Sequence, residues 1–220
     1  MLDRRLRRIK ETVLGPVASR LARVVSPGTV TALAFLLTLA AAGAAWAGLF
    51  VIALVAWLGG RLLDGLDGAV ARERGEASDL GGYVDMVLDT LGYALVPLGV
   101  ALWLDTRAGW IALGVMLAAF YVNTISWAYL AAILEKRALG VEASGEFTRI
   151  TMPPALVEGT ETIVVFAIFL IIPNRAPLIF AVMAAAVMVG VVQRLNWARL
   201  HLGGLAGRDE GNGGARDGGS

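Results

Sequence analysis

Long apolar runs separated by short polar clusters dominate the pattern along the chain. No charged residue occurs between Val30 and Gly60, and a single helix of that length would extend about 46 Å against a hydrocarbon core of roughly 30 Å. Two helices fit this run better, with a turn near residues 43–48, the first starting at about Pro27 and the second running to Arg72. Further apolar runs cover about residues 81–104, 108–134, 153–173 and 176–200. The pattern predicts an all-α integral membrane protein with six transmembrane helices in residues 26–202.

The ends of the chain have other patterns. Within residues 1–25, apolar side chains recur at helical spacing while arginines and Lys10 cover the other face. This is typical of an amphipathic helix on an anionic membrane surface, the alternative being a helix packed on a protein partner. Residues 203–220 are rich in Gly and charge and predict a disordered tail.

Composition supports the membrane assignment and excludes several kinds of site. Hydrophobic residues make up 57% of the chain and charged residues 17%, against about 25% charged in soluble domains. A net charge of +1 leaves no basic face for nucleic acid. Without cysteine there is no disulfide or thiolate chemistry, and one histidine excludes a multi-histidine metal site.

The distribution of charge predicts an orientation in the cell membrane. The Arg-rich N-terminus is expected to stay in the cytoplasm, and alternation then places residues 72–79, 135–149 and the tail after Arg194 on the same side. The predicted outer loops carry only Asp105, Arg107 and Arg175.

Four aspartates mark the end of the second predicted helix and the start of the third. Asp64 and Asp67 are spaced i,i+3, and Asp85 and Asp89 are spaced i,i+4, so each pair projects from one face of its helix. Antiparallel helices that turn near Gly75 would hold all four acids at a common depth. The four carboxylates are therefore expected to face one another at the cytoplasmic edge of the membrane.

Carboxylates gathered in this way repel one another unless a cation lies between them, and oxygen ligands suit hard divalent ions. A metal site is the favoured interpretation, because a purely solvating role is costly beside long apolar runs. Gly68, Ala71, Gly81 and Gly82 leave room for another group near the backbone, and Arg72 supplies a cation of the kind that a phosphorylated ligand requires.

These residues also carry a family signature. The run Asp64-x-x-Asp67-Gly68-x-x-Ala71-Arg72, followed after eight residues by Gly81-x-x-x-Asp85-x-x-x-Asp89, resembles the CDP-alcohol phosphotransferase (CDP-alcohol phosphatidyltransferase, class I) motif at every fixed position. The stretch Pro27-Gly28-Thr29-Val30-Thr31 is similar to the family's Pro-Asn-x-Ile/Val-Thr segment, with Gly28 in place of Asn.

The resemblance implies an enzyme that transfers a substituted phosphoryl group from a CDP-alcohol to a second alcohol and releases CMP. It implies two Mg²⁺ or Mn²⁺ ions held by Asp64, Asp67, Asp85 and Asp89, with Asp89 as general base. It further implies a homodimer and a donor site for the CDP moiety, made by Gly68, Ala71, Arg72, Gly81 and Thr31.

The expected donor is CDP-diacylglycerol, whose acyl chains can remain in the bilayer while the CDP reaches the metals. The expected acceptor is a small polar alcohol such as glycerol 3-phosphate, inositol phosphate or serine. Two alternatives remain: a CDP-aminoalcohol donor with diacylglycerol as acceptor, and a divalent-cation transporter, which would place its charges near the bilayer midplane.

Other charged residues are candidates for the acceptor site. The cationic candidates are Lys136, Arg137, Arg149 and Arg194, which positive-inside topology alone would also produce. Glu158 and Glu161 are ionisable groups within a predicted span, where such groups usually face the protein interior or a cavity. They suit a cationic head group, and equally a structural ion pair or a dimer contact.

Overall fold

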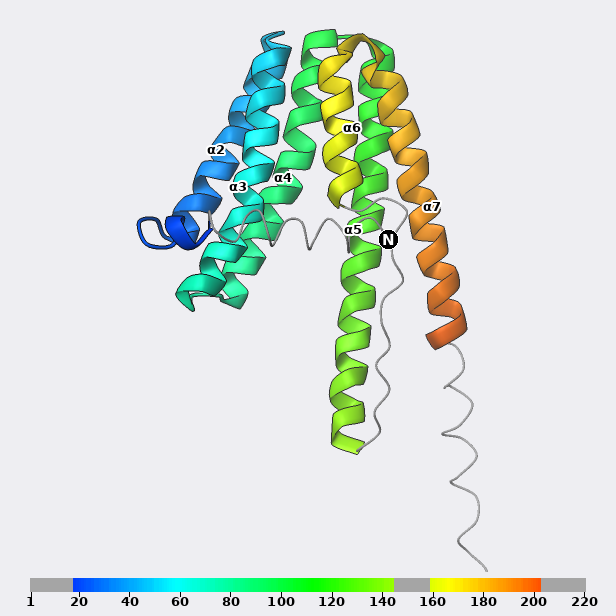
Figure 1. Cartoon of the computed structure of the whole chain (residues 1–220). Coiled ribbons are helices and arrows are strands. Elements are labelled where there is room, and N and C mark those ends of the chain that lie inside the picture. The colour runs from blue at the N-terminus through cyan, green and yellow to red at the C-terminus, as the bar shows by residue number, and fades with distance from the viewer. Residues whose placement is uncertain (1–17, 145–158, 203–220) are drawn as a thin grey trace, which may run out of the picture. The chain divides into compact units, whose positions relative to one another are not determined.

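The computed structural model describes residues 18–144 and 159–202. Helices make up almost all of this part of the chain, and it contains no strand. The first unit of the fold contains α2, α3 and α4, which lie side by side in Figure 1, together with α6 and the first portions of α5 and α7. The helix bounds are α2 Pro27–Trp46, α3 Phe50–Arg74, α4 Asp79–Leu104, α5 Arg107–Ser144, α6 Gly159–Ile171 and α7 Ala176–Leu202, with a 3₁₀ turn at Pro173–Arg175.

Most helix ends lie within a few residues of the sequence prediction. The exception is α5, which continues to Ser144 where the hydrophobic pattern predicted an end near residue 134. The extension follows from the local sequence, because Glu135, Lys136 and Arg137 are good helix formers and no proline interrupts them. Part of the predicted cytoplasmic loop 135–149 is therefore helical.

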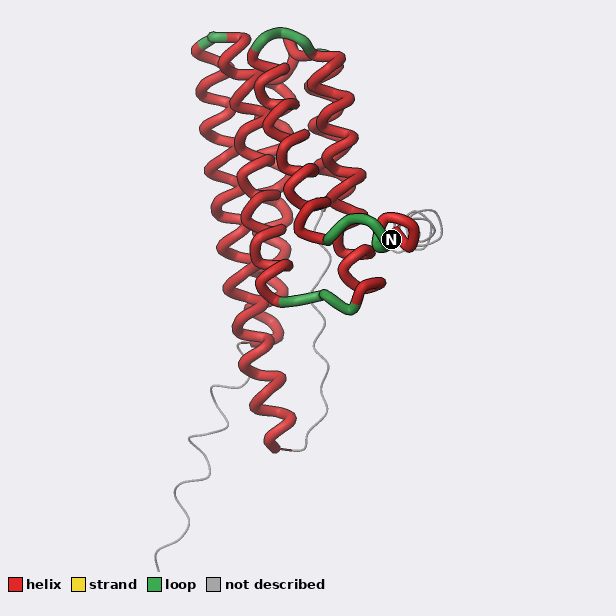
Figure 2. The backbone as a smooth tube through the Cα atoms, turned by 90° about the vertical axis from the view of Figure 1, so that its left-hand side faces the viewer, coloured by secondary structure: helices red, strands yellow, loops and turns green. Residues whose placement is uncertain are grey.

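Local backbone geometry and capping explain the two turns that connect α2 to α3 and α3 to α4. Gly48 and Gly75 adopt the left-handed conformation, with φ of 76° and 65°, and Gly75 ends α3 where the sequence predicted the turn. The Ser78 hydroxyl accepts a hydrogen bond from the Gly81 amide and begins α4. Figure 2 shows these loops at opposite ends of the helices, so consecutive helices are antiparallel.

Small residues let α2 approach both of its neighbours closely. A Cβ atom on Gly99 of α4 would lie 2.3 Å from the carbonyl oxygen of Ala42, and one on Gly92 would lie 2.7 Å from Cγ2 of Thr38. On α3, a Cβ atom on Gly60 would lie 3.1 Å from the Ala34 carbonyl oxygen. Close backbone contact of this kind is typical of helix packing in membranes.

A series of aromatic contacts fills the interior of the first unit on the other side of α3. Trp57 stacks on Phe166 of α6 at 4.8 Å between ring centroids, and its indole N–H donates to the Ile163 carbonyl. The series continues from Phe166 to Phe169 and then to Phe180 of α7. All four rings are fully buried. This packing fixes the depth and rotation of α3, which carries half of the aspartates.

The segment before α2 docks against the charged end of α3. Ala18 belongs to a buried cluster with Leu66 and Val70, while the Ser19 hydroxyl donates to Glu73 at 2.8 Å. Arg74 donates to the Ala22 carbonyl oxygen at 2.7 Å. Residues 18–21 are helical, and the remainder of the predicted amphipathic helix lies outside the described residues, as does the predicted tail.

Within residues 18–144 and 159–202, four helices are long and apolar enough to cross a membrane: α2, α4, the first 30 residues of α5, and the continuous segment Pro173–Leu202. The composition of α3 differs because its second half carries the charged residues of the motif. The described part of α6 has only 13 residues. The protein is an integral membrane protein, and six crossings remain a prediction.

The chain divides into two compact units. The first consists of residues 1–117 and 159–183, and it contains the four aspartates. The second consists of residues 118–158 and 184–220, so α5 and α7 each begin in the first unit and end in the second.

Candidate metal centre and donor site

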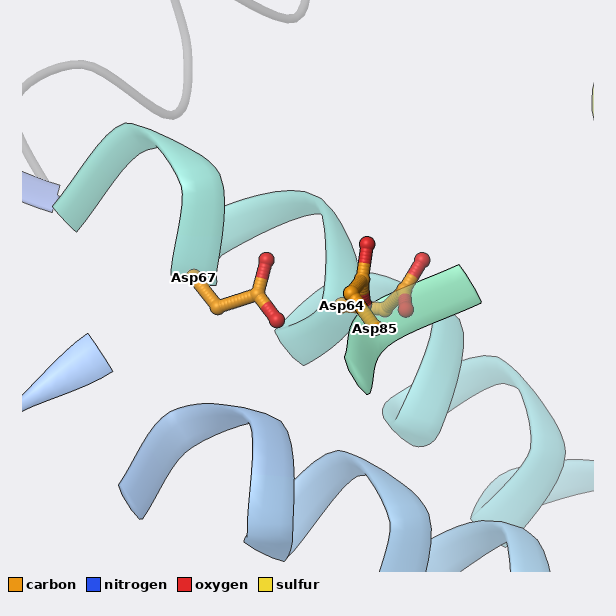
Figure 3. A group of neighbouring side chains, drawn as sticks. All are labelled: Asp64, Asp67 and Asp85. Atoms are coloured by element: carbon orange, nitrogen blue, oxygen red, sulfur yellow. The ribbon is translucent and has the colours of Figure 1, made fainter. Parts of the chain in front are cut away.

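Three of the four predicted aspartates converge between α3 and α4, two to three helical turns from the Gly75 turn. Asp64, Asp67 and Asp85 each offer a carboxylate oxygen, and these oxygens all lie within 4.8 Å of one another. Figure 3 shows the Asp67 side chain extending toward Asp64 and Asp85, the last of which comes from the neighbouring helix. Asp67 is buried, and Asp64 and Asp85 are half-buried.

A threonine from α2 orients one of these carboxylates. The Thr31 hydroxyl lies 2.7 Å from Oδ2 of Asp67 and also 3.2 Å from the Pro27 carbonyl oxygen. Its distance to Asp67 is that of a strong hydroxyl–carboxylate hydrogen bond. The resemblance assigned Thr31 to the donor site, and the structure places its hydroxyl on a carboxylate of the cluster.

The fourth aspartate, Asp89, has a different partner. Its Oδ1 contacts Nη1 of Arg61, one turn before Asp64 on α3. The same Nη1 lies 3.7 Å from Oδ2 of Asp64. Asp89 is therefore held by an arginine, whereas Asp64, Asp67 and Asp85 form the compact acidic group.

Sequence reasoning missed Arg61. Its side chain is only 6% exposed, and Nη2 donates to the Thr38 hydroxyl at 3.2 Å. Its guanidinium carbon lies 4.9 Å from the Trp57 ring centroid and 5.7 Å from that of Tyr93, within the range of cation–π contacts. The available signal was an arginine that ends a long uncharged run, three residues before the first motif aspartate.

The glycines in and beside the motif lie near the surface of α3 and α4. A Cβ atom on Gly82 would meet no atom within 4 Å, and Gly81 is exposed in the first turn of α4. Arg72 is exposed, and its Nη1 would lie 3.5 Å from a Cβ on Gly68. Gly68, Arg72 and Gly81 thus lie at an accessible surface near the aspartates, as a donor site for CDP requires.

The acidic group fits a hard divalent cation. Its three side chains offer only oxygen ligands, the kind that Mg²⁺, Mn²⁺ and Ca²⁺ prefer. At about 2.0–2.1 Å from its ligands Mg²⁺ bridges oxygens up to about 4.2 Å apart, and Ca²⁺ at about 2.3–2.6 Å bridges oxygens up to about 5.2 Å apart. The separations here, at most 4.8 Å, are of that size. Three carboxylates from two helices also need a cation to offset their mutual repulsion.

The described candidates for the acceptor site lie on α5, α6 and α7. Within the second unit, Arg194 of α7 is buried, and Nη1 donates to the side-chain oxygen of Asn123 at 3.2 Å and to the Ser126 hydroxyl at 3.3 Å. Lys136 is exposed on α5, and Glu161 is half-buried on α6 in the first unit. The Arg137 side chain, Arg149 and Glu158 lie outside the described residues.

Comparisons with known proteins agree with the motif. The family model described as CDP-alcohol phosphatidyltransferase matches residues 24–192, which is most of the chain. The chain belongs to the CDP-alcohol phosphatidyltransferase family. This CDP-alcohol phosphatidyltransferase is 36% identical over 179 residues to the inner membrane protein YnjF of Escherichia coli, covering 79% of this chain and 83% of that protein.

Two further similarities concern proteins with named products. A 78-residue stretch, 36% of this chain, is 36% identical to 42% of the archaetidylinositol phosphate synthase of Pyrococcus horikoshii. The phosphatidylinositol phosphate synthase of Mycobacterium tuberculosis with CDP-DAG bound has the same fold, with a TM-score of 0.64, 24% identity, and coverage of 86% of this chain and 94% of that one. A structure of that enzyme with manganese and citrate gives a TM-score of 0.61 at 24% identity, covering 83% of this chain and 87% of that one.

Proposed function

We propose that this phosphatidyltransferase moves the phosphatidyl group of CDP-diacylglycerol to a small polar alcohol and releases CMP. The observation that carries the proposal is the group Asp64, Asp67 and Asp85, whose oxygens lie within 4.8 Å of one another. Its ligand type suits the cations that bind a diphosphate. The structural neighbour with CDP-DAG bound supports this donor.

The aspartates are assigned different tasks. Asp64, Asp67 and Asp85 hold divalent ions, with Asp67 oriented by the Thr31 hydroxyl. Two Mg²⁺ or Mn²⁺ ions, when bound, would neutralise the diphosphate and stabilise the charge that develops during transfer. The Mn-bound structural neighbour supports this class of ion.

The donor is bound at the exposed side of the same helices. Arg72 pairs with its phosphates, and Gly68, Ala71 and Gly81 admit the cytidylyl group against the backbone. Asp89 accepts the proton of the acceptor hydroxyl as that oxygen attacks the phosphorus atom. The site lies on the cytoplasmic side of the cell membrane, where the CDP head group of the lipid donor can meet a dissolved polar alcohol, and the enzyme works as a homodimer.

The acceptor belongs to the class of glycerol 3-phosphate, inositol phosphate and serine. Among these we favour an inositol phosphate, because the archaetidylinositol phosphate synthase shares a stretch with this chain and makes a product of that class. Arg194 would bind the phosphate of such an acceptor, since its hydrogen-bond partners on α5 are neutral and leave its charge unpaired by a carboxylate.

A substrate screen tests the proposal. Purified protein is given CDP-diacylglycerol and each acceptor in turn, with Mg²⁺, Mn²⁺ or EDTA, and CMP release is measured. We expect release with one polar alcohol and a divalent ion, and none in EDTA. Release only from a CDP-aminoalcohol with diacylglycerol would support the reverse arrangement. Uptake of Mn²⁺ into vesicles without CMP release from any CDP-alcohol would instead indicate a transporter.

A further inference from the structure

The segment of residues 18–25, which precedes α2, has two unlike sides. Its apolar side is packed on the buried cluster that includes Leu66 and Val70 of α3, and is made by Ala18, Leu21, Ala22 and Val25. On its other side Arg20, Arg23 and Val24 are exposed, Val24 by 84%. The inward side is therefore fixed by α3, while the outward side presents two guanidinium groups beside an apolar side chain.

Polar contacts fasten this segment to the end of α3. The Ser19 hydroxyl donates to Glu73 at 2.8 Å. Arg74 donates from Nη1 to the Ala22 carbonyl oxygen at 2.7 Å, and its Nε lies 2.8 Å from a carboxylate oxygen of Glu76 in the turn after α3. Carbonyl groups at the end of a helical turn lack partners within it, and a cation is favourable there. Arg74 thus links the segment to the turn between α3 and α4.

The helical hairpin beyond these contacts has little packing of its own. Residues 72–84 are all exposed, and they include Arg72 and Gly81 of the donor site. Val70 is the last buried residue of α3, and it belongs to the cluster on which the segment packs. The position of the donor-site residues therefore depends on how firmly the segment is attached to α3.

The outward side of the segment suits a bilayer surface. The candidate membrane span α2 begins at Pro27, two residues after the segment ends. Arg20 and Arg23 are spaced i,i+3 and share a face, and an exposed apolar residue beside such a pair is typical of an interfacial segment. Among the described residues neither arginine has a carboxylate partner. Each basic residue near an anionic surface adds about fivefold in affinity.

We propose that Arg20 and Arg23 bind the phosphate groups of anionic lipids, and that this binding holds residues 18–25 on α3 and keeps the donor site in place. The enzyme is then more active in a negatively charged membrane than in a zwitterionic one. The effect on the donor rests on the proposed function, whereas the lipid contact does not. Arg74 is a positioning residue between the segment and the donor site.

Hydrogen exchange tests the lipid contact. The full chain is placed in nanodiscs of phosphatidylcholine, with or without phosphatidylglycerol, and exchange is followed at residues 22–25, whose amides are all hydrogen-bonded within the segment. We expect wild-type exchange to be about tenfold slower in the anionic nanodiscs, and the ratio to fall to about threefold or less in Arg20→Gln/Arg23→Gln. The matched control, Arg107→Gln/Arg175→Gln, removes two exposed arginines elsewhere and should keep the wild-type ratio.

Donor kinetics test the link to the site. CMP release is measured with a fraction of CDP-diacylglycerol too small to change the surface charge. We expect the wild-type donor KM to be several-fold lower in anionic nanodiscs with kcat unchanged, because a better placed donor site improves binding and leaves the reacting groups as they are. Arg74→Gln keeps Arg20 and Arg23 but loses the Ala22 contact, so it should exchange faster at residues 22–25 and have a higher donor KM in both nanodiscs.

Four results would overturn the proposal. They are equal wild-type exchange in the two nanodiscs, the same loss of the ratio in the control pair as in Arg20→Gln/Arg23→Gln, protection by inorganic phosphate in neutral nanodiscs equal to that by anionic lipid, and a wild-type donor KM in Arg74→Gln. If wild-type protein releases no CMP from any substrate, the proposed function fails, whereas the exchange measurement still decides whether anionic lipid holds the segment.

Discussion

Two buried arginines illustrate how similar side chains take different roles in this protein. Arg61, in the first unit, contacts two carboxylates and lies against two aromatic rings. Arg194, in the second unit, donates to the amide oxygen of Asn123 and the hydroxyl of Ser126, and both of these groups are neutral. The charge of Arg61 is thus compensated by carboxylates of the protein, while the hydrogen-bond acceptors of Arg194 on α5 carry no charge.

The largest effect is expected at the carboxylate that Arg61 holds. Asp89→Asn should lower kcat for CMP release by about 10²–10⁴, the usual contribution of a general base. Mn²⁺ affinity should change little, because Asp64, Asp67 and Asp85 remain. Turnover at the wild-type rate in Asp89→Asn would exclude it as the base, and Asp85→Asn, which should weaken Mn²⁺ binding, is the matched control.

The second-largest effect is a difference in thermal stability between variants of Arg61 and Arg194. Arg61→Ala leaves Asp89 without its partner, and loss of one member of a buried pair costs about 3–5 kcal/mol. Arg194→Ala removes hydrogen bonds to neutral groups and should cost about 1–3 kcal/mol. Thermal unfolding in detergent should therefore show the larger loss for Arg61→Ala. Equal losses would mean that the ion pair adds nothing beyond packing.

The next effect concerns binding of a phosphorylated acceptor, for which we expect Arg194 to matter more than Arg61. Arg194→Gln should raise the acceptor KM about 10–100-fold, corresponding to one lost charge-assisted hydrogen bond, and leave the donor KM unchanged. The control is Arg199→Gln, an exposed arginine five residues later on α7. If both variants keep the wild-type acceptor KM, Arg194 has only a packing role.

The smallest effect is expected at Thr31. Thr31→Val removes the hydroxyl that donates to Asp67 at 2.7 Å and keeps the shape of the side chain. One hydrogen bond is worth about 1 kcal/mol, so Mn²⁺ affinity should fall about fivefold. Thr29→Val, which loses only a bond to Ser26, provides the comparison. Identical Mn²⁺ affinity in both variants would show that Thr31 does not orient the ligand.

Much of the first unit follows from local pattern. The spacing of the four motif aspartates and the glycine at 75 predicted a helical hairpin with facing acids, and the structure brings three of the four, Asp64, Asp67 and Asp85, into one group. Apolar run length located most helix ends, because each helix must match the bilayer thickness. The same motif predicted the family, because this chain has the family's residue at every fixed position of the motif, and the family model matches residues 24–192.

Contacts between side chains of different helices could not be predicted from the sequence. The spacing of Arg61 and Asp64 shows that they can meet on one helix, but not that Asp89 of α4 would approach the same guanidinium. That approach depends on α2 lying close to α4 at Gly92 and Gly99, which is a property of packing. In the sequence Thr38 lies within an apolar run, and only the structure shows that its hydroxyl accepts a hydrogen bond from Arg61.

The most direct test of the account is CMP release by the full chain in nanodiscs that contain CDP-diacylglycerol. The account predicts release that requires both a divalent ion and a polar alcohol, and that falls to background in Asp85→Asn although the variant remains folded. Release at the wild-type rate from Asp85→Asn or in EDTA would contradict the assignment of the aspartates to metal-dependent transfer.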